Sequence, residues 1–541
     1  MTAAHRLFGL CLLCLLTLAL AGCAGLPPPD RDRPQSAAVP ASEHTALGRV
    51  SRVTQAAAAL PAGADPTTSG FRLLPLGGFS LEARSQLASR AQVSLDLQYY
   101  HFANDEAGRH LLRALRDAAH RGVRVRLLLD DLYTGGEDEL LQSFAAHPGV
   151  EVRLFNPFTA ARGGGVLRRF LAAPGQWSRI NHRMHNKLFI ADGALAVMGG
   201  RNIANEYFLR NAAADNFIDV DALVAGPVLP PLQALFDRYW NSDSVSRLQV
   251  IAPTSRDAGA LQAEFESRTA PTQSAESRAM TRMDLSAQDV LGHGPVGPEL
   301  ERGVLDMHWG PAYVFADHPD KPFEGSAGGE LMETSVAFNL FEAIRMAQRE
   351  VTVSSPYFIP GSHGMALMRD LRGQGVQVRV LTNSATSTDE PLAYLGYSRY
   401  REPLLTLGVQ LYELSQRRLM DNTRMFHFGA SLGRLHAKTA VIDRRVSYIG
   451  SLNLDPRSAT LNTEIGAVID SAPLAAELLS LIEIDLLHSA HRVRLKADRV
   501  CCEWLRPDDA GMMVVSTEPD APWWLNLLGR WLRPFTPENQ L

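Results

Sequence analysis

The feature that most constrains this sequence is a short polar pattern that occurs twice. Residues 185–192 and 436–443 both have the form H-x-K-x-x-x-x-D. Each copy is followed by a glycine-containing turn that ends in an asparagine, Asn202 in the first copy and Asn453 in the second. The interval is the same in both, since 202 − 185 and 453 − 436 are each 17. We therefore expect a duplicated unit whose repeated polar residues share one purpose.

The segments before each copy repeat as well. Residues 93–100 alternate like a strand, and after a predicted helix residues 123–129 have the character of a second strand. The same order returns over residues 351–358 and 375–381, and the offset of 253 (376 − 123) indicates a duplicated domain rather than short repeats. Strands that alternate with helices favour a mostly parallel sheet. The predicted fold class is α/β, with two duplicated domains packed face to face around one shared active site.

The pattern divides the chain of 541 residues into six parts. We expect the stretch rich in Pro, Ala, Ser and charge near the N-terminus to be a flexible tether. In chain order the parts are a lipoprotein signal peptide (1–22), the tether (23–70), the first domain (71–250), a connecting segment (251–330), the second domain (331–490) and a C-terminal tail (491–541).

The N-terminus has the form of an export signal. His5 and Arg6 precede an apolar run over residues 7–20, which is too short to span a bilayer comfortably. The run ends in Leu-Ala-Gly-Cys23, which resembles the lipobox of bacterial lipoproteins, whose cysteine is lipidated. An ordinary signal peptide or an uncleaved anchor is the alternative. We therefore expect a bacterial envelope protein that is lipid-anchored on the periplasmic side. The residue after Cys23 is Ala24 and not the Asp associated with inner-membrane retention, so the outer membrane is favoured over the inner.

Further features of the sequence bear on partners and cofactors. Residues 522–534 carry three tryptophans among leucines and arginines, typical of a short interfacial helix, although packing onto the protein body explains them equally well. The net charge of −5 gives no general basic field, so no nucleic-acid partner is expected. The five cysteines show neither a disulfide framework nor zinc spacing, and we expect no metal and no cofactor.

The repeated residues carry groups suited to one reaction. Residues i and i+2 of a strand point to the same face, so His185 projects with Lys187 and His436 with Lys438. If the two halves face each other, these side chains and the two asparagines form a site that suits a phosphate diester. One histidine can attack phosphorus while the other protonates the leaving oxygen. The lysines stabilise the phosphate charge, so this chemistry requires no metal.

Acidic residues near the motifs are expected to have two different roles. Asp192 and Asp443 lie past a turn and point to the other face, so we expect both to be structural. An attacking imidazole needs its second nitrogen oriented by an acceptor, and Asp219 and Glu464 are the candidates, with Asp221 a close rival. Other candidates are two arginines, which either bind phosphate or form salt bridges, and three tyrosines expected mainly in the core: Arg183, Arg201, Tyr99, Tyr100 and Tyr357.

These motifs resemble the phospholipase D superfamily, which has a doubled H-x-K-x4-D motif. The resemblance covers residues 71–490 and implies two phospholipase D-like domains. Within this region, residues 98–100, 122–131, 152–158 and 183–187 are similar to the bacterial cardiolipin synthases, especially to their C-type branch.

The resemblance implies a phosphatidyl transfer through a phosphohistidine. His185 takes up the phosphatidyl group, while His436 protonates the departing alcohol and then deprotonates the incoming hydroxyl. Phosphatidylglycerol as acceptor gives cardiolipin, and phosphatidylethanolamine can be the donor in the C-type branch. Such synthases are usually held at the inner membrane, whereas this chain is expected to be held by a lipid on Cys23, with the C-terminal Trp segment as a candidate for a second membrane contact.

Several functions stay open on the sequence. Cardiolipin synthesis is preferred, and the alternative is a phospholipase D that transfers the phosphatidyl group to water and releases phosphatidic acid. A phosphodiesterase acting on nucleic acid could use the same site, but the acidic balance and the lipid anchor argue against it. A non-catalytic scaffold would be expected to have lost one of the four motif His and Lys residues, and all four are present.

Overall fold

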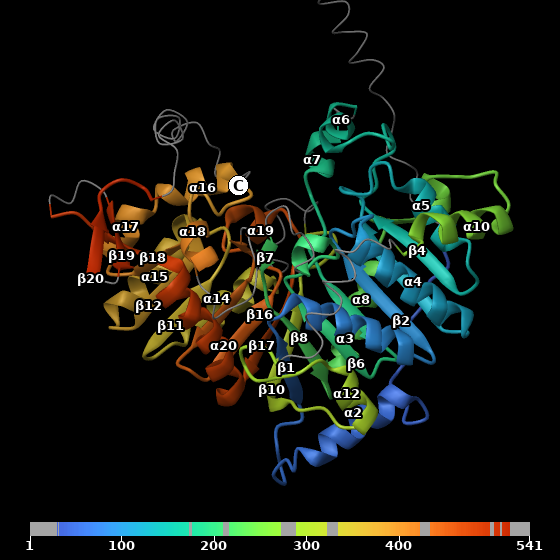
Figure 1. Ribbon diagram of the computed structural model, residues 1–541, viewed down its shortest axis with the longest axis horizontal. Coiled ribbons are helices and arrows are strands. Elements are labelled where there is room, and N and C mark those ends of the chain that lie inside the picture. The colour runs from blue at the N-terminus through green and yellow to red at the C-terminus, as the bar shows by residue number, and fades with distance from the viewer. Residues whose placement is uncertain are drawn as a thin grey trace, which may run out of the picture.

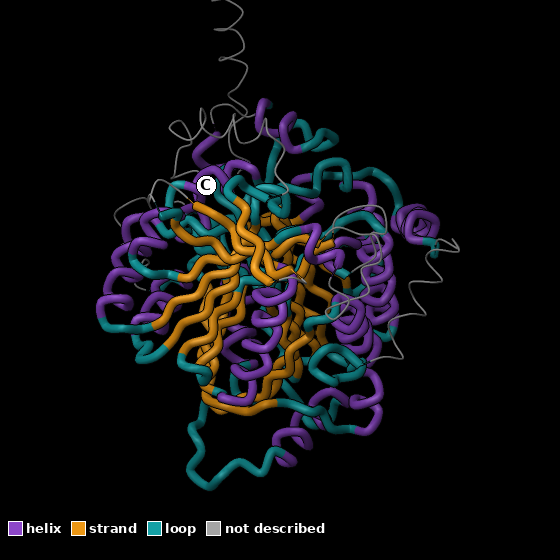
Figure 2. The backbone as a smooth tube through the Cα atoms, turned by 60° about the vertical axis from the view of Figure 1, so that its left-hand side comes forward, coloured by secondary structure: helices purple, strands orange, loops and turns teal. Residues whose placement is uncertain are grey.

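The protein has two similar halves that lie side by side, each a β-sheet covered by helices (Figure 1). The computed structural model describes Asp30 and residues 32–172, 176–208, 216–271, 288–321, 334–421, 433–497, 502–508 and 511–519. The predicted signal peptide, Cys23 and the Trp-rich segment therefore lie outside the described residues. Figure 2 shows the strands of both halves running through the middle of the molecule, with helices around them.

The sheet of the first half is mixed. Three central strands, β2, β3 and β4, are parallel, as the alternating pattern predicts, but the hairpin that carries the motif adds antiparallel strands beside them. Its order is β9-β4-β3-β2-β5-β6-β8-β1. The bounds are β1 (Thr68–Leu74), β2 (Ser94–Tyr99), β3 (Arg124–Asp130), β4 (Val150–Phe155), β5 (Leu188–Ala191), β6 (Leu195–Gly199), β8 (Asp221–Ala225) and β9 (Val245–Arg247).

The second half repeats this order with two additional edge strands, β20-β19-β18-β13-β12-β11-β15-β16-β17-β10. Strand β10 also pairs antiparallel with β1, which joins the two sheets at one edge. The bounds are β10 (His308–Ala316), β11 (Glu350–Ser354), β12 (Gln377–Asn383), β13 (Gln410–Leu414), β15 (Thr439–Ile442), β16 (Val446–Gly450), β17 (Ile465–Asp470), β18 (Ala490–Leu495), β19 (Cys502–Asp508) and β20 (Gly511–Val515).

Several helices bury an apolar face on these sheets. In α4, for example, Asp105 caps the first turn by accepting a hydrogen bond from Gly108 N, and the leucines on one face are buried. The helices are α2 (Ala46–Ala57), α3 (Gly77–Arg90), α4 (Glu106–His120), α5 (Asp138–Ala145), α6 (Val166–Leu171), α7 (Trp177–Ile180), η2 (Asn205–Tyr207), α8 (Leu229–Trp240), α9 (Leu248–Ile251), α10 (Ala258–Thr269), α12 (Gly297–Arg302), α14 (Val336–Arg345), α15 (Gly361–Gly373), α16 (Pro391–Ser398), α17 (Arg401–Thr406), α18 (Gln416–Asp421), α19 (Pro456–Thr460), α20 (Ala472–Ile484) and η4 (Asp485–Ser489).

One hydrophobic core spans both halves. It combines Phe236 and Trp240 of α8 with Leu474 and Leu478 of α20 and with apolar residues of the central strands. Two short backbone pairings also cross between the halves: strand β7 (Asn216–Ile218) runs parallel to β14 (Gly433–Leu435), and Met184 pairs with Thr463. These pairings fix the two motifs relative to each other.

The prediction of a flexible tether over residues 23–70 is wrong for the residues that the structure describes, Asp30 and 32–70. Asp30 accepts hydrogen bonds from Arg247, and Arg33 donates to the carbonyl of Asn241 at 2.8 Å. Helix α2 follows, with Leu47 fully buried, and β1 begins at Thr68. The charges that suggested a solvated segment are instead paired with residues that follow α8.

Two predicted domain limits also change. The connecting segment (251–330) contains β10, which belongs to the second sheet, and the C-terminal tail (491–541) contains β19 and β20 of the same sheet. Strand β10 contains Gly310 and Pro311, and β19 contains Pro507, residues that interrupt a strand pattern, which is why the sequence did not reveal these strands. Among the described residues, no helix has both the length and the apolar character needed to cross a membrane.

Candidate active site at the interface of the two halves

Each motif lies on a β-hairpin whose two ends have different roles. In the first hairpin, Asp192 sits at the tight turn with φ of 51°, a left-handed conformation that Asp tolerates. Its carboxylate accepts hydrogen bonds from the backbone N–H of Gln92, Val93 and Ser94 at 2.8–3.1 Å. Aspartate and turn together fix the hairpin to the start of the neighbouring strand, at the end away from the histidine.

The second hairpin repeats this arrangement. Asp443 has φ of 52° and accepts from the N–H groups of Gln348, Arg349 and Glu350 at 2.8–2.9 Å. Both aspartates therefore sit where the sequence predicts structural residues. The strands expected to carry the histidines and lysines begin only after them, β5 at Leu188 and β15 at Thr439, so these four side chains lie on the segments that lead into the hairpins.

The two motif histidines each meet a carboxylate from the opposite half. His185 Nδ1 lies 2.9 Å from Glu464 Oε2, and His436 Nδ1 lies 2.6 Å from Asp219 Oδ2. The structure thus brings together all four residues, in pairs that cross the interface. Since Nδ1 faces the carboxylate, the Nε2 atom of each ring is left for chemistry.

The crossed pairing follows from the backbone contacts between the halves. His436 N donates to Ile218 O at 2.8 Å, which places Asp219 beside the imidazole. His185 N donates to Thr463 O at 2.8 Å, which does the same for Glu464. The rival acceptor Asp221 is used elsewhere, because it accepts from Ser80 and Arg84.

The two lysines are buried beside the histidines. Lys187 Nζ donates to His185 O at 2.6 Å, and Lys438 Nζ donates to His436 O at 2.5 Å. Lys187 also lies 5.2 Å from the centre of the Tyr100 ring. Burial lowers the pKa of Lys187 well below its usual value and that of Lys438 to about 8. A bound anion beside them favours the ammonium form of both lysines, so the site favours a phosphate group.

The two histidine–carboxylate pairs differ electrostatically. Burial raises the pKa of Glu464 to about 7 against the lowering effect of Lys187. Asp219 is also buried, but the charges and hydrogen bond of His436 and the charge of Lys438 hold its pKa at about 2. Asp219 is therefore ionised at neutral pH and stabilises a protonated His436 more than Glu464 stabilises a protonated His185.

The histidines follow this asymmetry. Burial, together with the charges of Lys187 and Lys438, lowers the pKa of His185 well below its usual value. Burial and Lys438 also lower the pKa of His436, but Asp219 raises it in opposition. A neutral imidazole is the nucleophilic form, and a protonated one is the acid. The environments suit His185 to the first role and His436 to the second.

The motif asparagines have different surroundings. Asn202 accepts a hydrogen bond from His101 N at 3.2 Å and donates to the Tyr207 hydroxyl at 2.9 Å. Asn453 Oδ1 is buried and has no hydrogen-bond partner within the described part of the chain, although the residue lines the cavity. Asn453 is thus available to a ligand, whereas Asn202 positions the aromatic wall.

A cavity of about 500 Å³ opens over both imidazoles. Rings pack against each of them, with centroid distances of 4.9 Å from Tyr100 to His185 and 5.0 Å from Tyr207 to His436. Its lining residues are Tyr100, His101, Leu132, Tyr133, Phe170, Asn181, His185, Asn202, Glu206, Tyr207, Phe217, Tyr357, Asp389, Glu390, Leu392, Ala393, His436, Asn453, Asp455, Arg457, Ser458 and Asn462.

Some tyrosines and arginines differ from expectation. Tyr100 and Tyr357 line the cavity, although core packing was expected, whereas Tyr99 is a core residue that accepts from Arg84. Arg183 pairs with Asp130, and Arg201 donates to backbone carbonyls, so both act in the scaffold.

The sequence analysis did not identify the aromatic residues Tyr207 and Phe217 as site residues, because only the three-dimensional fold places them beside His436.

The cavity lining also carries carboxyl groups. Glu206, Asp389, Glu390 and Asp455 line the cavity together with Arg457. Burial raises the pKa of Glu206 and Glu390 and that of Asp455 to about 6. The lining therefore combines the two motif imidazoles with carboxyl groups, and carboxyl groups suit hydroxyl or ammonium groups of a ligand.

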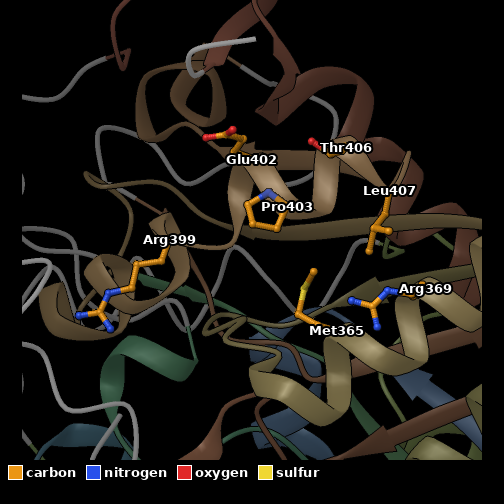
Figure 3. Close-up of a pocket in the computed structure, with 7 residues that line it drawn as sticks. All are labelled: Met365, Arg369, Arg399, Glu402, Pro403, Thr406 and Leu407. Carbon is orange, nitrogen blue, oxygen red and sulfur yellow. The ribbon is translucent and has the colours of Figure 1, made fainter.

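A second cavity of about 380 Å³ lies apart from this site (Figure 3). It sits between α15 and α17, and its lining includes Arg369, Arg399 and Glu402 but no residue of either motif. The cavity over the histidines is the one that carries the chemistry. Among the described residues, no three His, Cys, Asp or Glu side chains are grouped so as to hold a metal ion.

Comparisons with known proteins agree with this geometry. A family model described as "Cardiolipin synthase, PLD-like domain" matches residues 85–240 and 340–485, one match in each half. Cardiolipin synthase C of Escherichia coli (strain K12) is 36% identical over 455 residues, which cover 83% of this chain and 91% of the relative. A cardiolipin synthase of Geobacillus kaustophilus is 26% identical over 383 residues, covering 70% of this chain and 59% of the relative.

A solved structure shows the same fold. The phosphatidylserine synthase of Haemophilus influenzae aligns over 92% of this chain and 100% of its own, with a TM-score of 0.55 and 11% sequence identity. At that identity the likeness concerns the fold alone. Since both halves match the family model and the relative from Escherichia coli extends over most of the chain, this protein belongs to the cardiolipin synthase family with phospholipase D-like domains.

Proposed function

We propose that this protein transfers a phosphatidyl group through a phosphohistidine and makes cardiolipin from phosphatidylglycerol and a second phospholipid. The observation that carries the proposal is the pair of imidazoles over one cavity, each held by a carboxylate of the other half. Nucleophilic and acid–base histidines on one phosphodiester need this arrangement. The relatives named cardiolipin synthase support the choice of lipid.

In the first step, His185 Nε2 attacks phosphorus, and the bond to the departing alcohol breaks as His436 gives that oxygen a proton. Lys187 and Lys438 lie beside the histidines and neutralise the non-bridging oxygens. In the second step, His436 takes a proton from the hydroxyl of phosphatidylglycerol. The resulting alkoxide attacks phosphorus and releases His185, so that both histidines return to their starting states.

The carboxyl groups of the cavity lining support the proposed substrates. Glu206 and Asp389 line the same cavity as both imidazoles, so the headgroup of a phosphodiester bound there shares this space with them. Carboxylates accept hydrogen bonds from the glycerol hydroxyls of phosphatidylglycerol and pair with the ammonium group of phosphatidylethanolamine. The proposed partners are therefore these two lipids.

A product assay tests the proposal. The protein is mixed with vesicles of phosphatidylglycerol and phosphatidylethanolamine, and the lipids are resolved by mass spectrometry. Cardiolipin that disappears in His185→Ala supports the synthase. Phosphatidic acid alone makes the protein a hydrolase, and the absence of both products counts against phosphatidyl transfer.

We further propose that a lipid on Cys23 anchors the protein on the periplasmic side of the bacterial envelope, with the outer membrane favoured. The support is the lipobox-like sequence that ends at Cys23. Asp30 is fixed by Arg247, and the seven residues from Cys23 to Asp30 span at most about 25 Å. A lipid there would keep the first half close to the bilayer. Mass spectrometry of the mature N-terminus, with Cys23→Ser as control, tests the anchor, and the position of the Trp segment is tested by its truncation.

A further inference from the structure

Helix α6 exposes its leucines to solvent. Leu167 and Leu171, one helical turn apart, are 73% and 72% exposed. The other side of the helix is fixed, because Arg169 is fully buried against Asp131 and Phe170 packs on Phe158. The orientation of the leucines is therefore set by the fold, and a soluble surface gains nothing from two such side chains side by side.

This helix stands at the opening of the catalytic cavity. Its Phe170 lines the cavity, and so do Tyr133 of the first half and Leu392 at the start of α16 in the second half. Tyr133 and Leu392 are 43% and 52% exposed. Helices α6 and α16 both lie at the upper end of the molecule in Figure 1. We call Leu167, Leu171, Tyr133 and Leu392 the apolar rim.

We propose that the apolar rim inserts into the surface of a phospholipid bilayer and seats the cavity on it. The inference rests on the proposed function, because a lipid substrate must enter headgroup first while its acyl chains stay in an apolar medium. Exposed leucines on both sides of the opening allow the apolar part of the bilayer to reach the cavity. Interfacial segments combine such apolar side chains with basic ones, and the exposed Arg168 lies between the two leucines in sequence.

The N-terminal part of the chain is consistent with this orientation. Asp30 is held by Arg247 of β9, and β9 pairs with the carboxyl-terminal part of β4, from which the chain continues toward α6. A lipid on Cys23, within about 25 Å of Asp30, would hold this same part of the first half near the bilayer.

The test compares Leu171→Asp and the double variant Leu167→Asp/Leu171→Asp with Met346→Asp. Met346 is also 72% exposed, but it follows α14 near the Asp443 turn, at the opposite end of the hairpin from His436. On vesicles of phosphatidylglycerol and phosphatidylethanolamine, we expect the α6 variants to lose about tenfold in turnover, because charges at an apolar interface weaken insertion. On the soluble diester bis(p-nitrophenyl) phosphate, they should stay within about twofold of wild type. Met346→Asp should match wild type on both substrates.

Equal turnover by the α6 variants and wild type on vesicles would overturn the inference, and so would an equal loss on the soluble diester. A second readout does not depend on turnover. An environment-sensitive fluorophore on Leu171→Cys should shift to the blue when vesicles are added, whereas the same fluorophore on Met346→Cys should not. If wild type makes no lipid product but the fluorescence of the Leu171 label shifts, the proposed function is wrong, whereas insertion of the apolar rim into the bilayer is supported. If the fluorescence of the Leu171 label does not shift, and wild type forms a dimer that Leu171→Asp dissociates, the apolar rim would instead be a contact with a second copy of the chain.

Discussion

Asp219 of the first half and His436 of the second meet at 2.6 Å across the interface between the halves. Their counterparts Glu464 and His185 meet at 2.9 Å in the opposite direction. Neither half can form a complete histidine–carboxylate pair alone. Duplication of the domain therefore does more than supply two histidines, since each half orients the nucleophile or acid of the other.

The contact between Asp219 and His436 predicts that Asp219→Asn strongly reduces turnover. The amide leaves the shape of the side chain intact but removes the charge that stabilises protonated His436. Since general acid–base assistance contributes about 10²–10⁴-fold, we expect turnover to fall at least about a hundredfold. Initial rates on phosphatidylglycerol vesicles measure the loss, and circular dichroism checks the fold. A folded variant with nearly normal turnover would show that Asp219 does not support the acid.

Replacement of the motif aspartates should reduce stability rather than chemistry. Asp192→Ala removes a buried acceptor of three backbone N–H groups, of which that of Ser94 is buried and those of Gln92 and Val93 are partly accessible to water. Since a buried unsatisfied donor costs about 1–3 kcal/mol and the other two lose less, the variant should be destabilised by about 2–4 kcal/mol. Asp443→Ala should cost less, because its three partners are less buried and water replaces the carboxylate. Thermal unfolding compares the two. Turnover per folded molecule should stay close to wild type, and a stable but inactive Asp192→Ala would contradict the structural role.

The buried carboxyl group of Asp485 predicts that the stability of the protein depends on pH. This carboxyl group is 4% exposed, and burial raises its pKa to about 7. A raised pKa means that the folded state binds the proton more tightly than the unfolded state. The resulting stabilisation is complete below about pH 4 and is lost as the pH rises through about 7.

Accordingly, the melting temperature of wild type should fall between pH 5 and pH 8, and Asp485→Asn should reduce that fall. Glu464, whose pKa is also about 7, contributes a slope of the same sign that remains in the variant. Identical pH profiles for wild type and Asp485→Asn would show that Asp485 does not contribute. The measurement needs only unfolding curves at several pH values.

The site also predicts independence from divalent metal ions. The phosphate oxygens are neutralised by Lys187 and Lys438, which are fixed beside the histidines. Product formation on vesicles should therefore be unchanged by EDTA after correction for any effect on the vesicles themselves. Strong inhibition that added Mg²⁺ or Ca²⁺ restores would contradict this prediction.

Much of this arrangement follows from the sequence, because local patterns and the repeat are visible in it. The strands before each motif and a hairpin turn near each motif aspartate follow from the sequence, whereas the motif His and Lys residues precede β5 and β15 rather than lie on them. The acceptors Asp219 and Glu464 were named, but their crossing was not, since β7 and β14 lie more than 200 residues apart and pair only in the folded chain. Local alternation contains no information about such a contact.

Other parts needed the structure for related reasons. Tyr207 beside His436 depends on the same interface between the halves. The segment from Asp30 to Thr67 has the composition of a tether, yet its charges find partners such as Arg247 on the first half. Composition describes what a segment would do in water and does not reveal the partners that fold against it.

The central claim is that His185 carries the phosphatidyl group between the two steps. The direct measurement is mass spectrometry of peptides from the wild type, quenched in alkali during turnover of phosphatidylglycerol vesicles. The account predicts a phosphatidyl adduct on the peptide that contains His185, and no adduct in His185→Asn. An adduct on His436 in the wild type, or turnover that persists in His185→Asn, would contradict it.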